Sequence, residues 1–227
     1  MKYITSLIIL LIIFFIYCHI TRLKTLNNEL RILQVADPEP ELLLEMQAQH
    51  LPIVFQREIY AWKHFNKLIG KPLTEIQKTL STPPTEIDYS EIIKLNLEPN
   101  NLPLSYDWIL DMRNIVLDEK AAIFFIKQTN YMQLFGCVGG EMRVIVAPPD
   151  QAPLLGSFIN NVSNSDSTAL LDKNPAELRF VEIIVRCGNM IYIPYGWHYF
   201  IYKNSKVEGN EETIIIDCLN KSLLSAI

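Results

Sequence analysis

The chain has few of the residues that bind metals or form cross-links. Among its 227 residues there are only four histidines and four cysteines. The cysteines form no Cys-X-X-Cys pair and the histidines are not four residues apart, so the sequence indicates no zinc cluster and no helical metal motif. The net charge is −5 and no basic cluster occurs, which argues against nucleic acid as a partner.

The longest apolar run lies at the N-terminus. No charged residue occurs from Tyr3 to Thr21, and residues 7–16 are continuously apolar. Because a bilayer-spanning helix needs about 20 mostly apolar residues, residues 3–21 predict a single-pass transmembrane anchor. The alternative is a cleaved signal peptide, although no Ala-X-Ala-like cleavage site follows the run.

Residues 22–36 follow the apolar run and carry leucines at alternating spacings of three and four. This spacing predicts a helical juxtamembrane stalk, although two heptads are too few for a coiled coil. The basic residues Arg22, Lys24 and Arg31 outnumber the single Lys2 on the other side of the run. The positive-inside rule therefore favours a membrane protein whose C-terminal domain is cytoplasmic.

Residues 37–227 predict one folded domain, which begins with the helix-breaking segment 37–40. Helices are predicted over 41–49, 58–69, from 74 onward, and over 106–113. From residue 121 the sequence changes to short apolar runs bounded by turn residues such as Gly139-Gly140. Strands are predicted over 51–55, 121–126, 131–138, 142–147, 178–186, 190–193, 199–202 and 213–219. The expected fold class is mainly β with N-terminal helices (α+β).

One motif stands near the C-terminus, where Gly188 and an apolar run precede Pro194-Tyr-Gly-Trp197. This segment resembles the closing segment of the cupin-like, JmjC-type family of iron and 2-oxoglutarate oxygenases. In that family the run reads Gly-Asp-X-X-Tyr-Ile-Pro-X-X-Trp-X-His, and the last His binds iron. In this register the ligand position is Tyr199. His198 stands one place earlier and is expected to point away from the cavity, because neighbouring strand side chains face opposite ways.

The upstream half of the resemblance is the strand that ends in Pro148-Pro149-Asp150-Gln151. The family's spacing places its His-X-Asp pair on Lys127 and Thr129, and its 2-oxoglutarate-binding lysine on Met142. A protonated lysine has no lone pair and a threonine hydroxyl is a poor iron ligand, whereas a non-haem Fe(II) site needs two His and one carboxylate. The resemblance therefore implies a degenerate member with neither Fe(II) nor 2-oxoglutarate as cofactor and with no catalytic residue.

The resemblance also implies a double-stranded β-helix, the jelly-roll variant of cupins, behind the transmembrane helix; many short strands suit this fold. Tyr192, Trp197 and His198 are candidates to line a pocket, although aromatic residues in strands belong more often to the core. Tyr199 is expected to fill the space of the absent iron, with its hydroxyl bonded to Lys127 or Thr129.

Three functions are consistent with these observations. The leading hypothesis is a membrane-anchored pseudoenzyme that serves as a binding or scaffolding module and has a protein partner. The second is an active 2-oxoglutarate-dependent protein hydroxylase or demethylase with non-standard ligands. The third is a cupin-type small-molecule binder or metal-free enzyme, which would need a polar cavity.

Overall fold

The computed structural model describes residues 2–23, 25–36, 45–46, 48–57, 69, 71–72, 75, 109–117, 123–129, 132–155, 178–203 and 213–221. These residues are mostly β-sheet with an N-terminal helix, α1 (Lys2–Leu23), so the expected predominance of β-structure is confirmed. The helices predicted over 58–69 and from 74 onward lie almost entirely outside the described residues.

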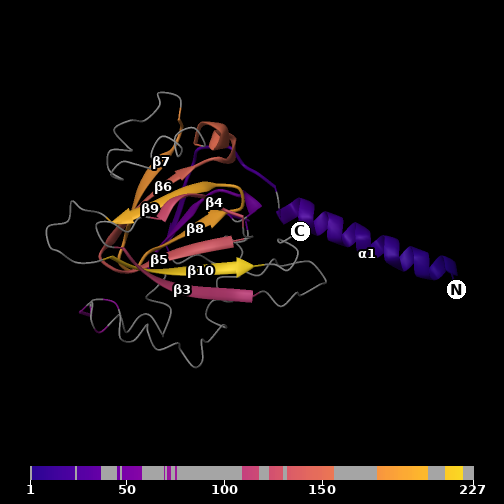
Figure 1. Cartoon of the computed structure of the whole chain (residues 1–227), viewed down its shortest axis with the longest axis horizontal. Helices are drawn as coiled ribbons and strands as arrows, with labels where there is room; N and C mark the ends of the chain where they lie inside the picture. Colours follow the sequence, from indigo (N-terminus) through magenta and orange to yellow (C-terminus); the bar gives the residue numbers. More distant parts are fainter. Residues whose placement is uncertain are drawn as a thin grey trace.

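Helix α1 stands away from the β-sheets, as Figure 1 shows. Its large apolar side chains from Tyr3 to Tyr17, apart from the half-buried Ile16, are exposed around the helix rather than along one stripe. Counting only the residues that the structure describes, no helix meets the combined length and apolarity of a membrane-crossing span.

The helical stalk predicted for residues 22–36 is wrong beyond Leu23. Residues 25–32, which we call the N-terminal strap, form no helix, and residues 33–36 form strand β1 (Leu33–Ala36). Strand β1 pairs in parallel with β2 (Ile53–Gln56). Leu30, Ile32 and Leu33 pack against the hydrophobic core. Burial of these side chains in an extended segment outweighs a helix propensity that is weak over so few turns.

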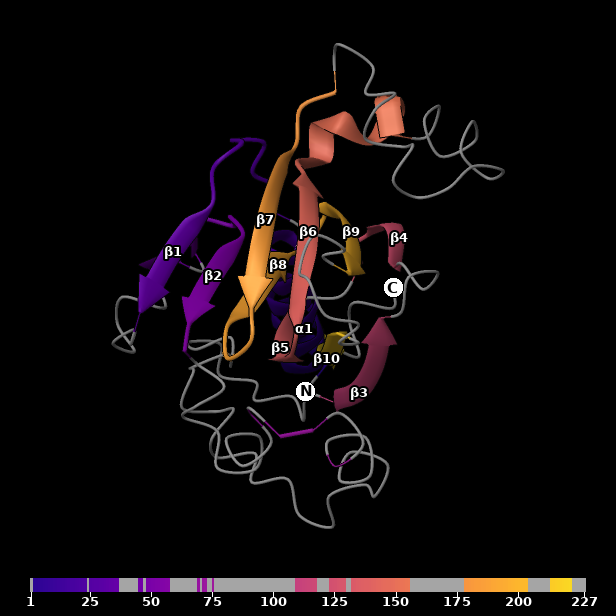
Figure 2. The ribbon, with the colours of Figure 1, turned by 90° about the vertical axis from the view of Figure 1, so that its left-hand side faces the viewer.

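The strands form two sheets. The six-stranded sheet has the order β1-β2-β8-β5-β10-β3, and the four-stranded sheet has the order β4-β9-β6-β7. Figure 2 shows β1 and β2 side by side at one edge. The other strands are β3 (Ile109–Leu117), β4 (Ile123–Lys127), β5 (Met132–Gly139), β6 (Glu141–Ala147), β7 (Val181–Arg186), β8 (Met190–Pro194), β9 (His198–Lys203) and β10 (Thr213–Lys221).

The last eight strands pair in a nested, antiparallel order. β3 pairs with β10, β4 with β9, β5 with β8, and β6 with β7. The first strand of this series thus pairs with the last, the second with the second-to-last, and so on inwards to β6 and β7, which follow each other in the sequence. The series behaves as one long antiparallel ribbon that is wound so that its strands are shared between the two sheets.

A second prediction, a helix over residues 106–113, is wrong for its described part, because residues 109–113 belong to strand β3. Residues 109–117 instead pair with β10 along the whole length of both strands, from Ile109 opposite Lys221 to Leu117 opposite Thr213. A ladder of this length supplies backbone hydrogen bonds that a short isolated helix cannot match. The strands predicted over 51–55, 131–138, 142–147, 190–193, 199–202 and 213–219 are confirmed to within two residues at each end.

The core lies between the two sheets, because their strands alternate in the direction of their side chains. On β6, Met142, Val144 and Val146 belong to the central apolar cluster, whereas Ile145 and Ala147 pack on the outer face of the same sheet. This period of two is the signature of a strand with a different environment on each face.

Candidate functional site

Three polar side chains lie inside the central apolar cluster. They are Gln133 on β5, Tyr199 on β9 and Asp217 on β10, and all three are buried. Each faces the core because its cross-strand neighbour does: Gln133 is paired with Ile193, Tyr199 with Val146, and Asp217 with Phe135. Two strands from one sheet and one strand from the other therefore bring these groups together.

A chain of two hydrogen bonds connects the three residues. The Tyr199 hydroxyl donates to Gln133 Oε1 at 3.0 Å, and Gln133 Nε2 donates to Asp217 Oδ1 at 2.8 Å. The amide thus accepts at its oxygen and donates at its nitrogen, which suits a phenol that donates and a carboxylate that can only accept. Burial of these polar groups is tolerated because they are hydrogen-bonded to one another.

Burial raises the pKa of Tyr199 to about 12, and the negative charge of Asp217 acts in the same direction. The hydrogen bond to Gln133 lowers the pKa but does not offset these two effects. At neutral pH the phenol is therefore protonated, and its hydroxyl hydrogen is donated to Gln133 Oε1. A neutral phenol in this position is a hydrogen-bond donor rather than a metal ligand or a base.

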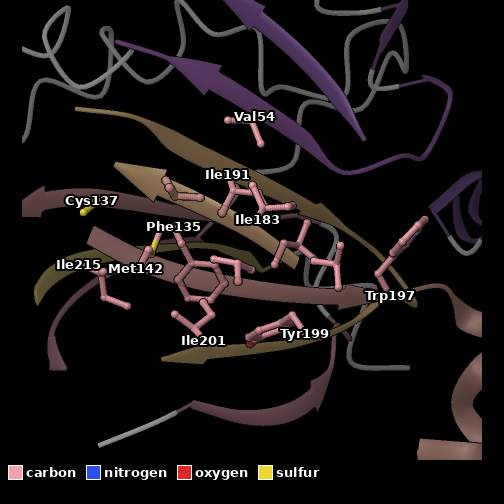
Figure 3. Close-up of a cluster of buried hydrophobic side chains, with 14 of the residues drawn as sticks. Val54, Phe135, Cys137, Met142, Ile183, Ile191, Trp197, Tyr199, Ile201 and Ile215 are labelled. Carbon is pink, nitrogen blue, oxygen red and sulfur yellow. The ribbon is translucent and has the colours of Figure 1, made fainter. Parts of the chain in front are cut away.

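The ring of Tyr199 fills space in the core. Its centroid lies 5.2 Å from that of Phe135, with the two rings tilted by 55°. Figure 3 shows Tyr199 and Trp197 towards one end of the cluster and Met142 and Cys137 towards the other. The expectation that Tyr199 is buried is therefore confirmed, but the expectation that its hydroxyl bonds to Lys127 or Thr129 is wrong.

The positions that the family's spacing assigns to the metal and the cosubstrate do not converge. Lys127 and Thr129 are both exposed, and Lys127 lies opposite His198 on the side of the sheet that faces away from Tyr199. Met142 is fully buried and faces the core. Of these four residues, only Tyr199 and Met142 reach the space between the sheets.

The three candidate pocket residues are also separated. Trp197 lies in the core and donates its Nε1 hydrogen to the carbonyl of His50 at 3.1 Å. Tyr192 is paired with Ile53 and lies on the face of β8 opposite to the inward Ile191 and Ile193. His198 lies on the outer face of the other sheet. Strand alternation sends these three candidates to different places, so they do not line a common pocket.

His198 itself points away from the core, as the one-residue slip predicts. It is buried and is paired with Ala147, which packs on the outer face of the four-stranded sheet. Its Nδ1 is buried and has no hydrogen-bond partner. Burial lowers the pKa of His198 below 6.5, and the positive charge of Lys127 adds to this effect.

The residues at this site do not fit Fe(II) and 2-oxoglutarate. Among the described residues, the polar groups that meet around Tyr199 are a neutral phenol, an amide and a carboxylate that already accepts a hydrogen bond. A facial triad needs two imidazoles and one carboxylate. Within the described part of the chain, no three His, Cys, Asp or Glu residues group closely enough to hold a metal ion.

Sequence reasoning missed Gln133 and Asp217. Each is a polar residue inside an apolar strand, at an even spacing from residues that face the core: Gln133 precedes Phe135 by two positions and Asp217 follows Ile215 by two. A polar residue at a core-facing position is a signal for a buried hydrogen-bond partner. The identity of that partner depends on the sheet order.

The chain matches no protein-family model and no curated protein sequence. Among solved structures, it is similar to the crystal structure of Drosophila melanogaster CENP-C bound to CAL1, with a TM-score of 0.30 and 13% sequence identity. The similarity covers 48% of this chain and 63% of that chain, which is less than two thirds of its length. A TM-score of this size supports no conclusion about fold or function.

The hydrogen-bonded chain predicts the effect of two substitutions at Tyr199. Tyr199→Phe keeps the ring but leaves Gln133 Oε1 buried without its donor, and should lower the free energy of unfolding by about 1–3 kcal/mol. Tyr199→Ala also removes the ring and should cost about 3–5 kcal/mol. Urea unfolding monitored by circular dichroism measures both values. A Tyr199→Ala variant as stable as the parent chain would contradict the packing described for this residue.

The buried His198 predicts a pH dependence of stability. Because its pKa is lower in the folded chain than in the unfolded chain, the unfolded chain binds the proton first as the pH falls. Stability should therefore decrease as the pH drops below about 7, through the unfolded pKa near 6.5, until the lower folded pKa is reached. The test measures the free energy of unfolding in urea for the parent chain and for His198→Asn, at about pH 7 and again below the unfolded pKa near 6.5. The other titrating groups contribute equally to the two chains, so a difference between their pH profiles belongs to His198. Parallel pH profiles for the two chains would show that His198 is not the cause.

Proposed function

We propose that this chain is a cupin-like, jelly-roll domain that α1 holds at a membrane, and that it acts there as a binding or scaffolding module with a protein partner. In this proposal the domain does not use Fe(II) or 2-oxoglutarate. Function has to be argued from the site and not from the fold, because related folds serve many activities.

The jelly-roll assignment is supported by the nested pairing of β3 to β10. An eight-stranded antiparallel ribbon wound into two sheets is the arrangement that jelly rolls use. The resemblance of Pro194-Tyr-Gly-Trp197 and Pro148-Pro149-Asp150-Gln151 to the cupin-like, JmjC-type family favours the same architecture.

The observation that carries the proposal is the environment of Tyr199. The resemblance assigns the last iron-binding His to this position, and the residue there is an inward tyrosine packed on Phe135 with its hydroxyl donated to Gln133. A protonated phenol that donates its hydrogen to an amide does not supply the imidazole nitrogen that the iron site needs at this position. The packing supports a domain whose interior serves stability, so that binding would use its surface.

The alternative of an active oxygenase has one observation in its favour, which is the inward carboxylate of Asp217. Asp217 would be the single carboxylate that a facial triad requires. Asp217 accepts a hydrogen bond from Gln133. His198, the histidine that follows the Pro194-Tyr-Gly-Trp197 motif, lies on the outer face of its sheet and faces away from Asp217. We therefore favour the binding module over the oxygenase.

The membrane anchor is supported by the sequence of residues 3–21 and by the exposure of α1, whose side chains are described over residues 3–17 and at residue 21. Helices that are apolar on every side are found inside large proteins or in membranes. Because α1 projects from the sheets (Figure 1), we propose that lipid covers its exposed apolar side chains. The proposed orientation, from the basic residues that follow the run, places the domain in the cytoplasm.

The first test of this proposal measures iron. After incubation with Fe(II), the purified chain should retain no stoichiometric iron and should not decarboxylate 2-oxoglutarate, because Tyr199, Gln133 and Asp217 supply one carboxylate and no imidazole. Metal content by mass spectrometry and a turnover assay give the two readouts. The matched control is Asp217→Asn. One equivalent of iron in the parent chain that is lost in Asp217→Asn would establish the oxygenase instead.

The second test concerns the anchor. The full chain should stay with the membrane fraction in high salt and in alkaline carbonate, because apolar burial rather than charge would hold it. Ile12→Lys places a charge in the middle of the apolar run, at a cost of about 2.5–3.5 kcal/mol on an insertion scale, and should increase extraction, whereas Ile12→Leu should not. A mature chain that begins near Thr21 would reveal a cleaved signal peptide.

A further inference from the structure

The N-terminal strap (residues 25–32) is docked on the sheets and is not a free linker. A Cβ atom added at Gly196 would collide with Cδ2 of Leu26, so Leu26 lies directly on the turn between β8 and β9. Gly196 has a φ of 86°, which favours glycine, so its conformation and the close contact both select this residue. Asp150 donates its backbone N–H to Asn28 Oδ1 at 3.2 Å, which ties the strap to a second loop.

Further contacts hold the strap to the segment that precedes β2. Asn27 Nδ2 donates to the carbonyl of Gln49 at 2.7 Å, and Arg31 donates to Gln49 Oε1 at 2.9 Å. Leu30 and Ile32 pack on the core. With contacts to three separate segments, the strap cannot swing away without losing both apolar burial and hydrogen bonds.

The sandwich has two distinct ends. The proximal end comprises the turn 194–197 and residues 127–129 and 148–150; the distal end comprises the turns 139–141 and 186–190. In Figure 1, β8 and β10 point towards α1 whereas β7 and β9 point away from it. β8 and β9 have five and six residues, so the two ends are separated by about 15–20 Å.

Only residues 24 and 25 separate the end of α1 at Leu23 from Leu26. Three residue steps span at most about 11 Å even when fully extended. The turn that Leu26 contacts must therefore lie within a short distance of the end of the helix. The distal end has no such restraint and lies further away by the length of a strand.

We infer that the proximal end of the sandwich lies against the lipid headgroups, with the distal end turned away from the membrane. This inference rests on the proposed anchor. The exposed Lys127 and Thr129 then face the headgroups, where the ammonium group of Lys127 suits the phosphates of anionic lipids. Tyr195, which is half-buried in the turn itself, has the amphipathic side chain that is typical of a membrane interface. The distal turns remain accessible to a partner.

The experiment uses the full chain in vesicles of phosphatidylcholine and phosphatidylserine that contain a phosphatidylethanolamine with a photoactivatable diazirine on its headgroup. After flotation and irradiation, cross-linked residues are mapped by mass spectrometry. Because the distal end lies about 15–20 Å further from the lipid, the proximal end should carry at least about fivefold more cross-links. The matched control inserts about 20 Gly and Ser residues after Leu23, which adds about 25 Å of flexible reach and leaves every contact between the strap and the sheets intact.

The inserted spacer should abolish the preference for the proximal end without changing flotation. Equal cross-linking at both ends of the native chain overturns the inferred orientation while the anchor stands. A proximal preference that survives the spacer overturns the docked strap as the cause of the orientation. A chain that does not float with the vesicles overturns the anchor itself, and the orientation falls with it.

Discussion

The structure depends on the burial of two sheet faces against each other. Strands β5 to β10 of the nested ribbon place alternate residues into the space between the sheets, and that space is filled mostly by branched aliphatic and aromatic side chains. Because the side-chain period of a strand is two, a slip of one residue in any strand would exchange its inner and outer faces. The positions of Tyr199 in the core and His198 outside it follow from this constraint alone.

A buried hydrogen-bonded chain inside such a core limits the chemistry that it can perform. Gln133 connects a phenol on one sheet to a carboxylate on the other, so the three residues hold the two sheets in one register. Hydrogen bonds to a carboxylate are stronger than neutral ones, and each member would be costly to leave unpaired. A site of this kind favours rigidity, whereas an oxygenase needs open coordination positions and room for a cosubstrate.

The N-terminal strap links the membrane hypothesis to the sandwich. The residues that were expected to form a free-standing stalk instead contribute contacts to the core and a strand to the larger sheet. An anchor that is followed at once by a docked segment restricts the orientation of the domain. For a binding module this restriction decides which surface a partner can reach.

The sequence by itself determined the strands from residue 131 onward and the N-terminal helix, because alternation, turn glycines and a long apolar run are local signals. The inward position of Tyr199 was implied by the resemblance to the cupin-like family. It could not determine the partner of Tyr199, since Gln133 is 66 residues away and meets it only through the order of the sheets. It also misassigned residues 25–36 and 109–113, where a helical pattern of apolar residues was overridden by core burial and by pairing with β2 and β10. Local propensity is worth a fraction of a kilocalorie per residue, whereas a sheet ladder and core burial act over the whole segment. Only the tertiary structure therefore decided which of the apolar patterns became strands and which polar residues met inside.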